Sequence, residues 1–501
     1  MTDWLSGLEA VLDPTVLILT PLGILLGVLI GAMPGLSATV GIAIFLPFTF
    51  TLDPLPGLVL LLGIYNGACY AGSIPAILLR TPGTPASAAT VLDGYPMAQK
   101  GQAGLSLAVS LVASVVGGLI ATVMLIASAP AVAEFALTFG PAEYFALSVV
   151  ALTIIASLGE DSLAKGVLSA ALGVLVAMVG LDSISGASRF TFGTPELTGG
   201  VELIPLLVGL FGAAEAFVQI ERMHGAEHVS SMGSFRIGKK VLRSIAPTTV
   251  LSSVGGFFIG ALPGVGGDIG GYVAYNETRR FARQGKENFG KGDPRGVAAA
   301  ESANNSAQVG GLVPTLTLGI PGNTAAAVLI GALLVQGLRP GPQLFESDPD
   351  LVYGAFIAIF AGFAFLLLVG ALGIRAWAQV IRIPPLLLWP IVLVLSIIGA
   401  YAVRTNPFDV FVMLIAGGLG YLMMKGGYPV APFLIGVIIG PLAEDNYRLA
   451  MIQSGGTFGW ALDPIPFVLL VLALISLAVP LWRAHRGRRR TTRPDDEISQ
   501  V

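Results

Sequence analysis

The sequence has little charge. Only 11% of its 501 residues are Asp, Glu, Lys or Arg, whereas 54% are hydrophobic, and soluble domains carry about 25% charged residues. Several apolar runs reach the roughly 20 residues that a helix needs to cross a bilayer. The composition therefore excludes an ordinary soluble domain and predicts an all-α polytopic membrane protein.

Cysteine and histidine are also scarce. Cys69 is the sole cysteine, and His224, His228 and His485 all lie in basic segments outside the apolar runs. An intramembrane enzyme needs a nucleophile with a base, or a metal cluster, inside the membrane, and an ATP-driven pump needs a phosphate-binding loop that is missing here. We therefore expect no enzyme activity, no cofactor, no metal site and no nucleic-acid partner.

Proline and glycine, in contrast, are plentiful and interrupt two apolar segments in the same way. The stretch GGLVPTLTLGIPG at Gly310–Gly322 resembles GSIPAILLRTPG at Gly72–Gly83, and Pro321 follows Pro82 by 239 positions (321 − 82). Proline removes a backbone donor and disrupts a helix. A helix broken at membrane depth is tolerated only where it is buried in protein or lines a cavity, so the pair predicts two broken helices at a transport site.

Two further blocks recur between the halves of the chain. GAMPG at residues 31–35 matches GALPG at 260–264, and PLLVG at 205–209 resembles PFLIG at 432–436. Each half therefore predicts a helical hairpin, a broken helix and four more helices, which makes seven segments. The predicted domains are a first membrane repeat over residues 1–220, a basic cytoplasmic linker over 221–245, a second repeat over 246–445, and one extra C-terminal helix with a basic tail over 446–501.

Charge predicts how these segments are oriented. Residues 1–14 hold three acids and no Lys or Arg, whereas basic side chains cluster in residues 220–244, 276–295 and 482–493. Because basic segments stay in the cytoplasm, we expect a periplasmic N-terminus, a cytoplasmic C-terminus and no cleavable signal peptide. The tail is a topology anchor that can also contact anionic membrane lipids. Seven is an odd number, so the two repeats are expected to have inverted topology, which is typical of secondary transporters.

At these blocks the chain resembles the large membrane subunit of the tripartite tricarboxylate transporter family. The resemblance rests on three stretches: Gly27–Phe50, Tyr70–Gly94 and Ala298–Pro342. It implies a bacterial inner-membrane carrier for tri- or dicarboxylates such as citrate, with a periplasmic solute-binding protein, a small membrane subunit and coupling to sodium or protons. Asp268 departs from the small and hydroxyl residues expected there, which leaves open a carrier for another organic anion, such as an amino acid or an aromatic acid.

Helix N-termini at the breaks are the candidate carboxylate site, because their free N–H groups and partial positive charge attract anions. Hydroxyl and amide side chains just downstream add donors. The alternative is that the Gly and Pro residues simply permit tight packing. The candidate substrate-binding residues are Pro34, Gly35, Ser37, Thr39, Pro82, Gly83, Thr84, Pro263, Gly264, Pro321, Gly322, Asn323 and Thr324.

A coupling cation needs oxygen ligands instead, which unwound carbonyls and buried amides can supply. The candidate ion-binding residues are Asn66, Ser302, Asn304 and Asn305, and Asn66 and Asn305 are again 239 positions apart (305 − 66). Interhelical hydrogen bonds are the alternative role for these side chains. The sequence leaves two interpretations of Glu301 open, a functional membrane carboxylate or a residue at the cytoplasmic surface.

Overall fold

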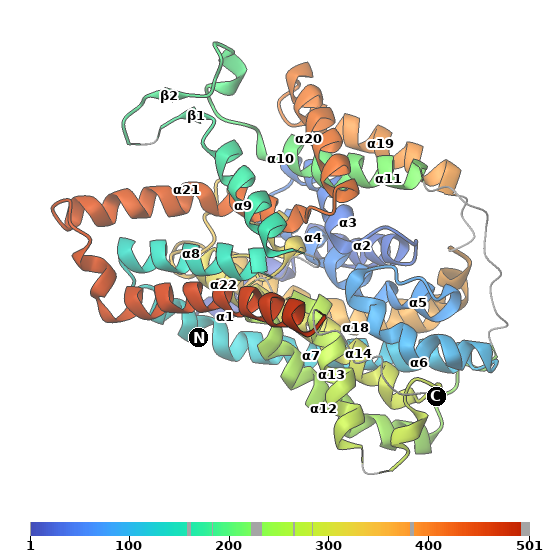
Figure 1. Cartoon of the computed structure of the whole chain (residues 1–501). Helices are drawn as coiled ribbons and strands as arrows, with labels where there is room; N and C mark the ends of the chain where they lie inside the picture. Colours follow the sequence, from blue (N-terminus) through green and yellow to red (C-terminus); the bar gives the residue numbers. More distant parts are fainter. Residues whose placement is uncertain are drawn as a thin grey trace, which may run out of the picture. The chain divides into compact units, whose positions relative to one another are not determined.

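The computed structural model describes residues 2–157, 162–182, 184–221, 233–263, 266–282, 284–380 and 385–491. Within these ranges the chain is almost wholly helical, and its strands are the two-residue pair β1 (Gly180–Leu181) and β2 (Ser188–Arg189), which run antiparallel (Figure 1). Seven of the described helices are long and apolar enough to cross a membrane. The predicted fold class, an all-α polytopic membrane protein, is confirmed.

Helices α1 to α11 make up the first half of the described chain. The first half contains α1 (Thr2–Val11), α2 (Pro14–Gly31), α3 (Ala38–Phe45), α4 (Pro54–Ala71), α5 (Ser73–Leu79), α6 (Ala88–Gln99), α7 (Ala103–Ala136), α8 (Pro141–Ser157), α9 (Leu163–Ala177), α10 (Leu203–Leu207) and α11 (Ala214–Glu221). Short 3-10 turns η1 (Leu46–Thr51), η2 (Pro85–Ser87) and η3 (Pro195–Leu197) and a π-helical turn η4 (Val208–Ala213) connect some of them.

The second half begins with α12 (Lys239–Gly260) and α13 (Gly266–Phe281), which form the second predicted hairpin. It continues with η5 (Lys286–Asn288), α14 (Pro294–Gly310), α15 (Leu312–Leu318), α16 (Thr324–Val335), α17 (Leu344–Ser347), α18 (Pro349–Val380), α19 (Pro385–Ala402), α20 (Pro407–Lys425), α21 (Val430–Gln453), η6 (Gly459–Leu462) and α22 (Pro464–Thr491). The two predicted broken segments are therefore α4–α5–α6 and α14–α15–α16.

The chain folds into two compact units. One unit comprises Met1–Thr138 and Thr191–Lys425, and the other comprises Phe139–Phe190 and Gly426–Val501. Both hairpins and both broken segments belong to the first unit, and each unit takes chain from both halves of the sequence. The predicted domain boundaries follow the sequence repeat instead of these units and stay a prediction.

Glycines bring the hairpins close to the broken segments. In the first half, a Cβ added at Gly27 of α2 would collide with the carbonyl oxygen of Ile64 on α4. In the second half, a Cβ at Gly256 of α12 would collide with the carbonyl oxygen of Ala303 on α14. These pairs match by the offsets of the repeat (256 − 27 = 229 and 303 − 64 = 239). Small residues let membrane helices approach this closely, so each hairpin is packed against its own broken segment.

The second unit contains a partly buried ion-pair network beside the short strands. Arg448 on α21 contacts the Asp182 carboxylate at 2.8 Å, and Arg189 on β2 contacts Glu444 on α21 at 2.8 Å. The Ser185 backbone N–H also donates to Asp182 at 2.6 Å. Hydrogen bonds from Ser185 are the main cause that holds the pKa of Asp182 well below its usual range. The ion pairs and hydrogen bonds thus stabilise the ionised form of Asp182, and with it the loop that follows α9.

A glycine substitution tests the close packing of α12 on α14. Gly260→Ala places a methyl group against the Ala307 carbonyl, and overpacking of this kind costs about 1–3 kcal/mol. We expect a lower melting temperature for the detergent-solubilised variant. Gly255→Ala in the same helix is the matched control, because nothing lies within 4 Å of its added Cβ. Equal melting temperatures for the two variants would contradict the packing.

The pKa of Asp182 predicts an acid-dependent loss of stability. A lowered pKa in the folded state stabilises the protein above the pKa of the unfolded chain, and this stabilisation is lost as the pH falls through the folded-state value. Asp182→Asn should therefore melt below the wild type at neutral pH. The difference should shrink under acidic conditions, below about pH 4. Melting curves across pH check this, and a difference that grows toward acid would contradict it.

Candidate functional site

The first break is a tight reversal of the backbone. Helix α4 runs into α5 through Gly72, and α5 ends at Arg80, whose φ of 61° is left-handed. The following Thr-Pro-Gly segment then returns along α5, and the Gly83 N–H donates to the Gly72 carbonyl at 3.1 Å. A Cβ on Gly83 would meet the Gly72 Cα at 2.8 Å. Both glycines are required because the two backbone segments touch directly.

The second break repeats this geometry. Helix α14 runs into α15 through Gly311, and α15 ends at Gly319, whose φ of 67° is left-handed and which lies 239 positions after Arg80 (319 − 80). The returning Gly322 lies against Gly311, and its N–H donates to the Thr315 hydroxyl at 3.2 Å. Both breaks thus place a Pro-Gly pair beside the junction glycine of a buried helix.

Each hairpin tip lies beside the break of its own half. The Gly31 carbonyl, at the end of α2, lies 2.6 Å from the position of an added Cβ on Gly83. At the start of α13, a Cβ added to Gly266 would lie 3.0 Å from the Cβ of Asn323. Pro34, Gly35 and Pro263 are half-buried at these tips. Gly264, a predicted site residue, lies outside the described residues, as does the side chain of Asp268.

Two of the five polar side chains predicted beside the breaks, those of Ser37 and Asn323, cap helices. The Ser37 hydroxyl accepts from the Val40 N–H at 3.3 Å at the start of α3, and the Asn323 amide oxygen accepts from the Ala326 N–H at 2.9 Å at the start of α16. Thr39 is buried and Thr324 is half-buried. After Pro82-Gly83, in contrast, the α-helix starts only at Ala88, because a 3-10 turn intervenes and the Thr84 and Ser87 hydroxyls bond each other at 2.6 Å.

The two broken helices cross each other in antiparallel directions. The Tyr65 hydroxyl on α4 donates to the Gln308 carbonyl on α14 at 3.5 Å, and the Cys69 thiol donates to the Asn304 amide oxygen at 3.2 Å. An increase of four on one helix therefore accompanies a decrease of four on the other. Adding 239 to residues 65 and 69 gives 304 and 308, so the two contacts exchange equivalent positions. The Asn323 amide also donates to the Tyr65 hydroxyl at 2.6 Å.

Several buried polar atoms on the two crossing helices have no hydrogen-bond partner within the described residues. They are the amide oxygens of Asn66, Asn305 and Gln308, the amide nitrogen of Asn304 and the hydroxyl of Tyr70. All five side chains are at least nine-tenths buried, and we refer to them as the polar cluster. An unpaired buried polar atom costs about 1–3 kcal/mol, so these groups require an explanation, and a bound ligand is one.

Three of the four predicted ion-binding residues, Asn66, Asn304 and Asn305, belong to this cluster. Ser302 is different, because its hydroxyl donates to the Ala299 carbonyl at 3.4 Å and its backbone packs on Gly117 of α7. Sequence reasoning missed Tyr70 and Gln308. Their spacing from Asn66 and Asn304, four residues along the same helix in each case, is the signal that could have identified them.

Glu301 is fully buried on α14 and does not lie at the surface. Its carboxylate accepts from the hydroxyls of Thr90 on α6 and of Ser114 on α7, the latter at 3.2 Å. Within the described residues no three His, Cys, Asp or Glu side chains gather as a metal site.

Comparisons with known proteins place the chain among transporters. The model of the "Tripartite tricarboxylate transporter TctA family" matches residues 17–435. An "Uncharacterized 52.8 kDa protein in TAR-I ttuC' 3'region" of Agrobacterium vitis is 38% identical over 485 residues, which cover 96% of each protein. An "Uncharacterized protein in TAR-II ttuC' 3'region" of the same organism is 35% identical over 243 residues, which cover 48% of this chain and 100% of that protein. No solved structure matches.

Replacing an amide of the polar cluster should abolish the stabilisation by ligand without lowering the stability of the protein without ligand. Asn305→Leu removes an unpaired buried oxygen, so we expect the melting temperature without ligand to stay level or rise. Sodium chloride should raise the melting temperature of the wild type by mass action but not that of the variant.

Asn446→Leu is the matched control for this variant. Its side chain donates to the carbonyl four residues earlier, as that of Asn305 does, but it lies on α21 in the other unit. It should keep the response to ligand. A response that persists in Asn305→Leu would exclude a binding role for that amide.

Proposed function

This chain belongs to the tripartite tricarboxylate transporter TctA family, and from that membership and the geometry of the breaks we propose that it is the substrate-translocating subunit of a secondary transporter for tri- and dicarboxylates such as citrate. The observation that carries the proposal is the pair of matching Pro-Gly reversals beside an unpaired polar cluster. Non-helical backbone at membrane depth is a feature of transporter binding sites.

We propose different groups for the carboxylate substrate and for the coupling cation. Backbone N–H groups near Pro82 and Pro321 and the side-chain groups near them are proposed to hold the carboxylates. Free N–H groups at helix starts favour anions. Ser37 and Asn323 currently cap such starts, so a substrate carboxylate is proposed to compete with them for the same N–H groups. The amide oxygens of the crossing are proposed to serve a coupling cation.

Two groups of contacts support the proposed inverted topology. In the first group, the rings of Trp4 and Tyr353 meet edge to face with centroids 4.6 Å apart, and Gln336 donates to the Thr49 carbonyl at 3.4 Å. Trp4 lies near the N-terminus, which the charge pattern predicts to be periplasmic, and the other three residues lie close to helix ends. The first half of the chain begins on this side. In the second half, the chain reaches this side only after the broken segment, where α18 begins.

The opposite side is supported by a second group of contacts. Lys100, at the end of α6, donates to the Lys291 carbonyl in a basic loop at 2.5 Å, and Lys425 contacts Glu221 at 2.8 Å. These residues lie beside the loops that the positive-inside rule places in the cytoplasm. We accordingly propose a bacterial inner-membrane protein with a periplasmic N-terminus and a cytoplasmic C-terminus. A small membrane subunit and a periplasmic solute-binding protein are its proposed partners.

Uptake into vesicles tests this function. The chain, its small subunit and its binding protein are reconstituted, and labelled citrate uptake is measured while sodium and pH gradients are varied separately. We expect accumulation that requires the binding protein and at least one gradient. Competition by unlabelled amino acids or aromatic acids, without competition by dicarboxylates, would move the substrate to another class of organic anion. Uptake that ignores both gradients would overturn secondary transport.

A further inference from the structure

Glu301 is a buried carboxyl group with no cationic partner among the described residues. Its two oxygens accept from the hydroxyls of Thr90 and Ser114, and none of the ion pairs of the described chain includes it. An isolated ionised carboxylate is very costly in a low-dielectric interior, so such a group tends to be neutral. The position equivalent to Glu301 in the first half is Leu62 (301 − 239), so this carboxyl is a feature of one half alone.

No described charged group on the elements packed against α14 forms an ion pair with Glu301. On α4, Tyr70 interacts electrostatically with it, and Cys69 bonds to Asn304. On α6 and α13, Asp93 and Tyr275 lie around Gly296, five residues earlier. Arg295, at the start of α14, is paired with Asp293. The remaining charged groups on the packed elements lie toward helix ends: Lys239, Lys240 and Arg243 on α12; Glu277, Arg279 and Arg280 on α13; and Glu134 on α7. The side chain of Asp268 on α13 lies outside the described residues.

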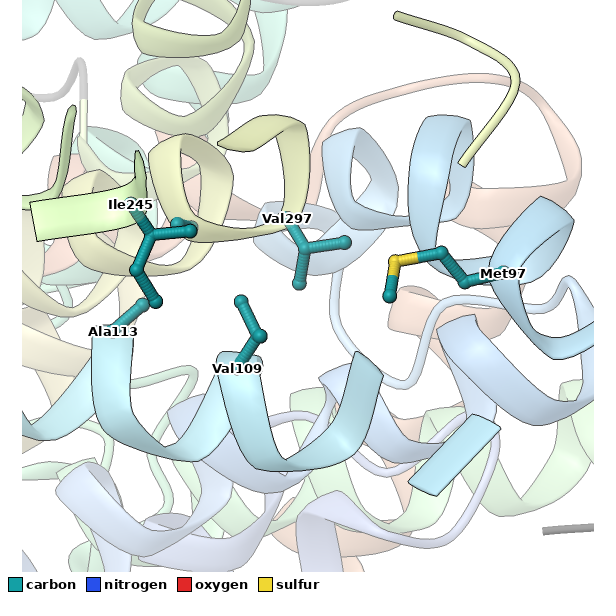
Figure 2. Close-up of a cluster of buried hydrophobic side chains, with 6 residues drawn as sticks. Met97, Val109, Ala113, Ile245 and Val297 are labelled. Atoms are coloured by element: carbon teal, nitrogen blue, oxygen red, sulfur yellow. The ribbon is translucent and has the colours of Figure 1, made fainter. Parts of the chain in front are cut away.

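Apolar packing on one side of Glu301 keeps water away. Val297, one turn before Glu301 on α14, belongs to a buried cluster with Val109, Ala113 and other apolar residues, and Figure 2 shows their side chains between α7, α12 and α14. Ala113 directly precedes Ser114, the residue that donates to Glu301. The carboxyl group is therefore held at the edge of a dry cluster, where gaining or losing its charge changes the free energy strongly.

Hydroxyl groups continue from Glu301 along α7. Ser106, Ser110 and Ser114 recur every four residues on this helix and are fully buried. Ser114 donates to Glu301, Ser110 bonds the Ser73 hydroxyl of α5 at 2.7 Å, and the Ser106 hydroxyl has no partner in the part of the chain that the structure describes. These hydroxyls lead toward the start of α7, which follows Lys100. Groups that can both donate and accept are suited to passing a proton.

We propose that Glu301 binds the proton whose movement down a pH gradient drives carboxylate uptake. The inference rests on the proposed function and adds a proton site to it, at a group separate from the amide oxygens proposed for a coupling cation. The carboxylate takes up one proton on the side of high proton concentration and releases the same proton on the other side, so no further reactant is needed. Both carboxyl oxygens accept from hydroxyl groups, and a hydroxyl can also accept from the carboxylic acid once it is protonated.

A transport assay with Glu301→Gln tests the proposal, because the amide resembles a permanently protonated carboxyl. In the reconstituted complete transporter, a one-unit pH gradient should give about tenfold citrate accumulation for each proton carried by the wild type. The variant should lose this accumulation and keep the exchange of internal for external citrate. Glu346→Gln, at an exposed glutamate, is the control and should behave as the wild type. Accumulation by Glu301→Gln that still follows the pH gradient, or wild-type accumulation that follows sodium alone, overturns the proposal.

Infrared spectroscopy gives a readout that does not depend on the substrate. In pH-titrated difference spectra of the purified chain, the wild type should show a protonated carboxylic-acid band that is missing in Glu301→Gln and present in Glu346→Gln. A band that persists unchanged in Glu301→Gln overturns the proton site, even where citrate proves to be the wrong substrate. If the band is missing in Glu301→Gln and the wild type does not transport citrate, the proton site is retained and the substrate assignment is rejected.

Ser114→Ala provides a second variant if Glu301→Gln does not fold. Removing the hydroxyl takes a hydrogen bond from the charged carboxylate, so half-titration of the acid band should move to higher pH. Ser169→Ala is the matched control, at a buried serine of α9 whose hydroxyl has no partner within the described residues, and it should leave the titration unchanged. Equal titrations for the two variants would contradict the role of Glu301.

Discussion

Backbone polar groups inside a bilayer need partners from the protein, because the lipid offers none. At the first break the Gly83 N–H finds the Gly72 carbonyl, and at the second the Gly322 N–H finds the Thr315 hydroxyl. These bonds permit a chain reversal within an apolar segment. Glycine is required at the contact, because a side chain would hold the two backbone segments apart. The rest of the proposed transport site depends on these reversals.

The same constraint explains the arrangement around the breaks. Glycines of α2 and α12 bring the hairpin helices against the carbonyls of α4 and α14, so the hairpin tips reach the Pro-Gly pairs. The two broken helices then cross through Tyr65–Gln308 and Cys69–Asn304, with unpaired amides beside the crossing. Unpaired amides lower stability, and such a cost is expected where a site is reserved for a ligand. The crossing helices thus hold five of the buried polar groups that have no partner within the described residues.

Sequence patterns predicted the helices and the breaks well, because apolar length and Pro-Gly pairs are local signals. The separation of Asn66 and Asn305, which equals the 239-position offset of the Pro-Gly pairs, also pointed to two members of the polar cluster. The return of Gly83 to Gly72 was not predictable, since it depends on a left-handed Arg80, a conformation that non-glycine residues rarely adopt. The burial of Glu301 was equally hidden, because its partners Thr90 and Ser114 lie far away in the sequence. Helix capping by Ser37 and Asn323 was likewise missed, since these residues were expected to donate to substrate.

The crossing of α4 and α14 is the central claim, and the native cysteine allows a direct measurement of it. Cys69 contacts Asn304, so Asn304→Cys should form a disulfide with Cys69 under mild oxidation, detected as linked fragments after proteolysis between the two halves. Gln308→Cys should not, because residue 308 contacts Tyr65, one helical turn away. A disulfide in the Gln308→Cys protein and none in the Asn304→Cys protein would contradict the antiparallel crossing and the proposed site with it.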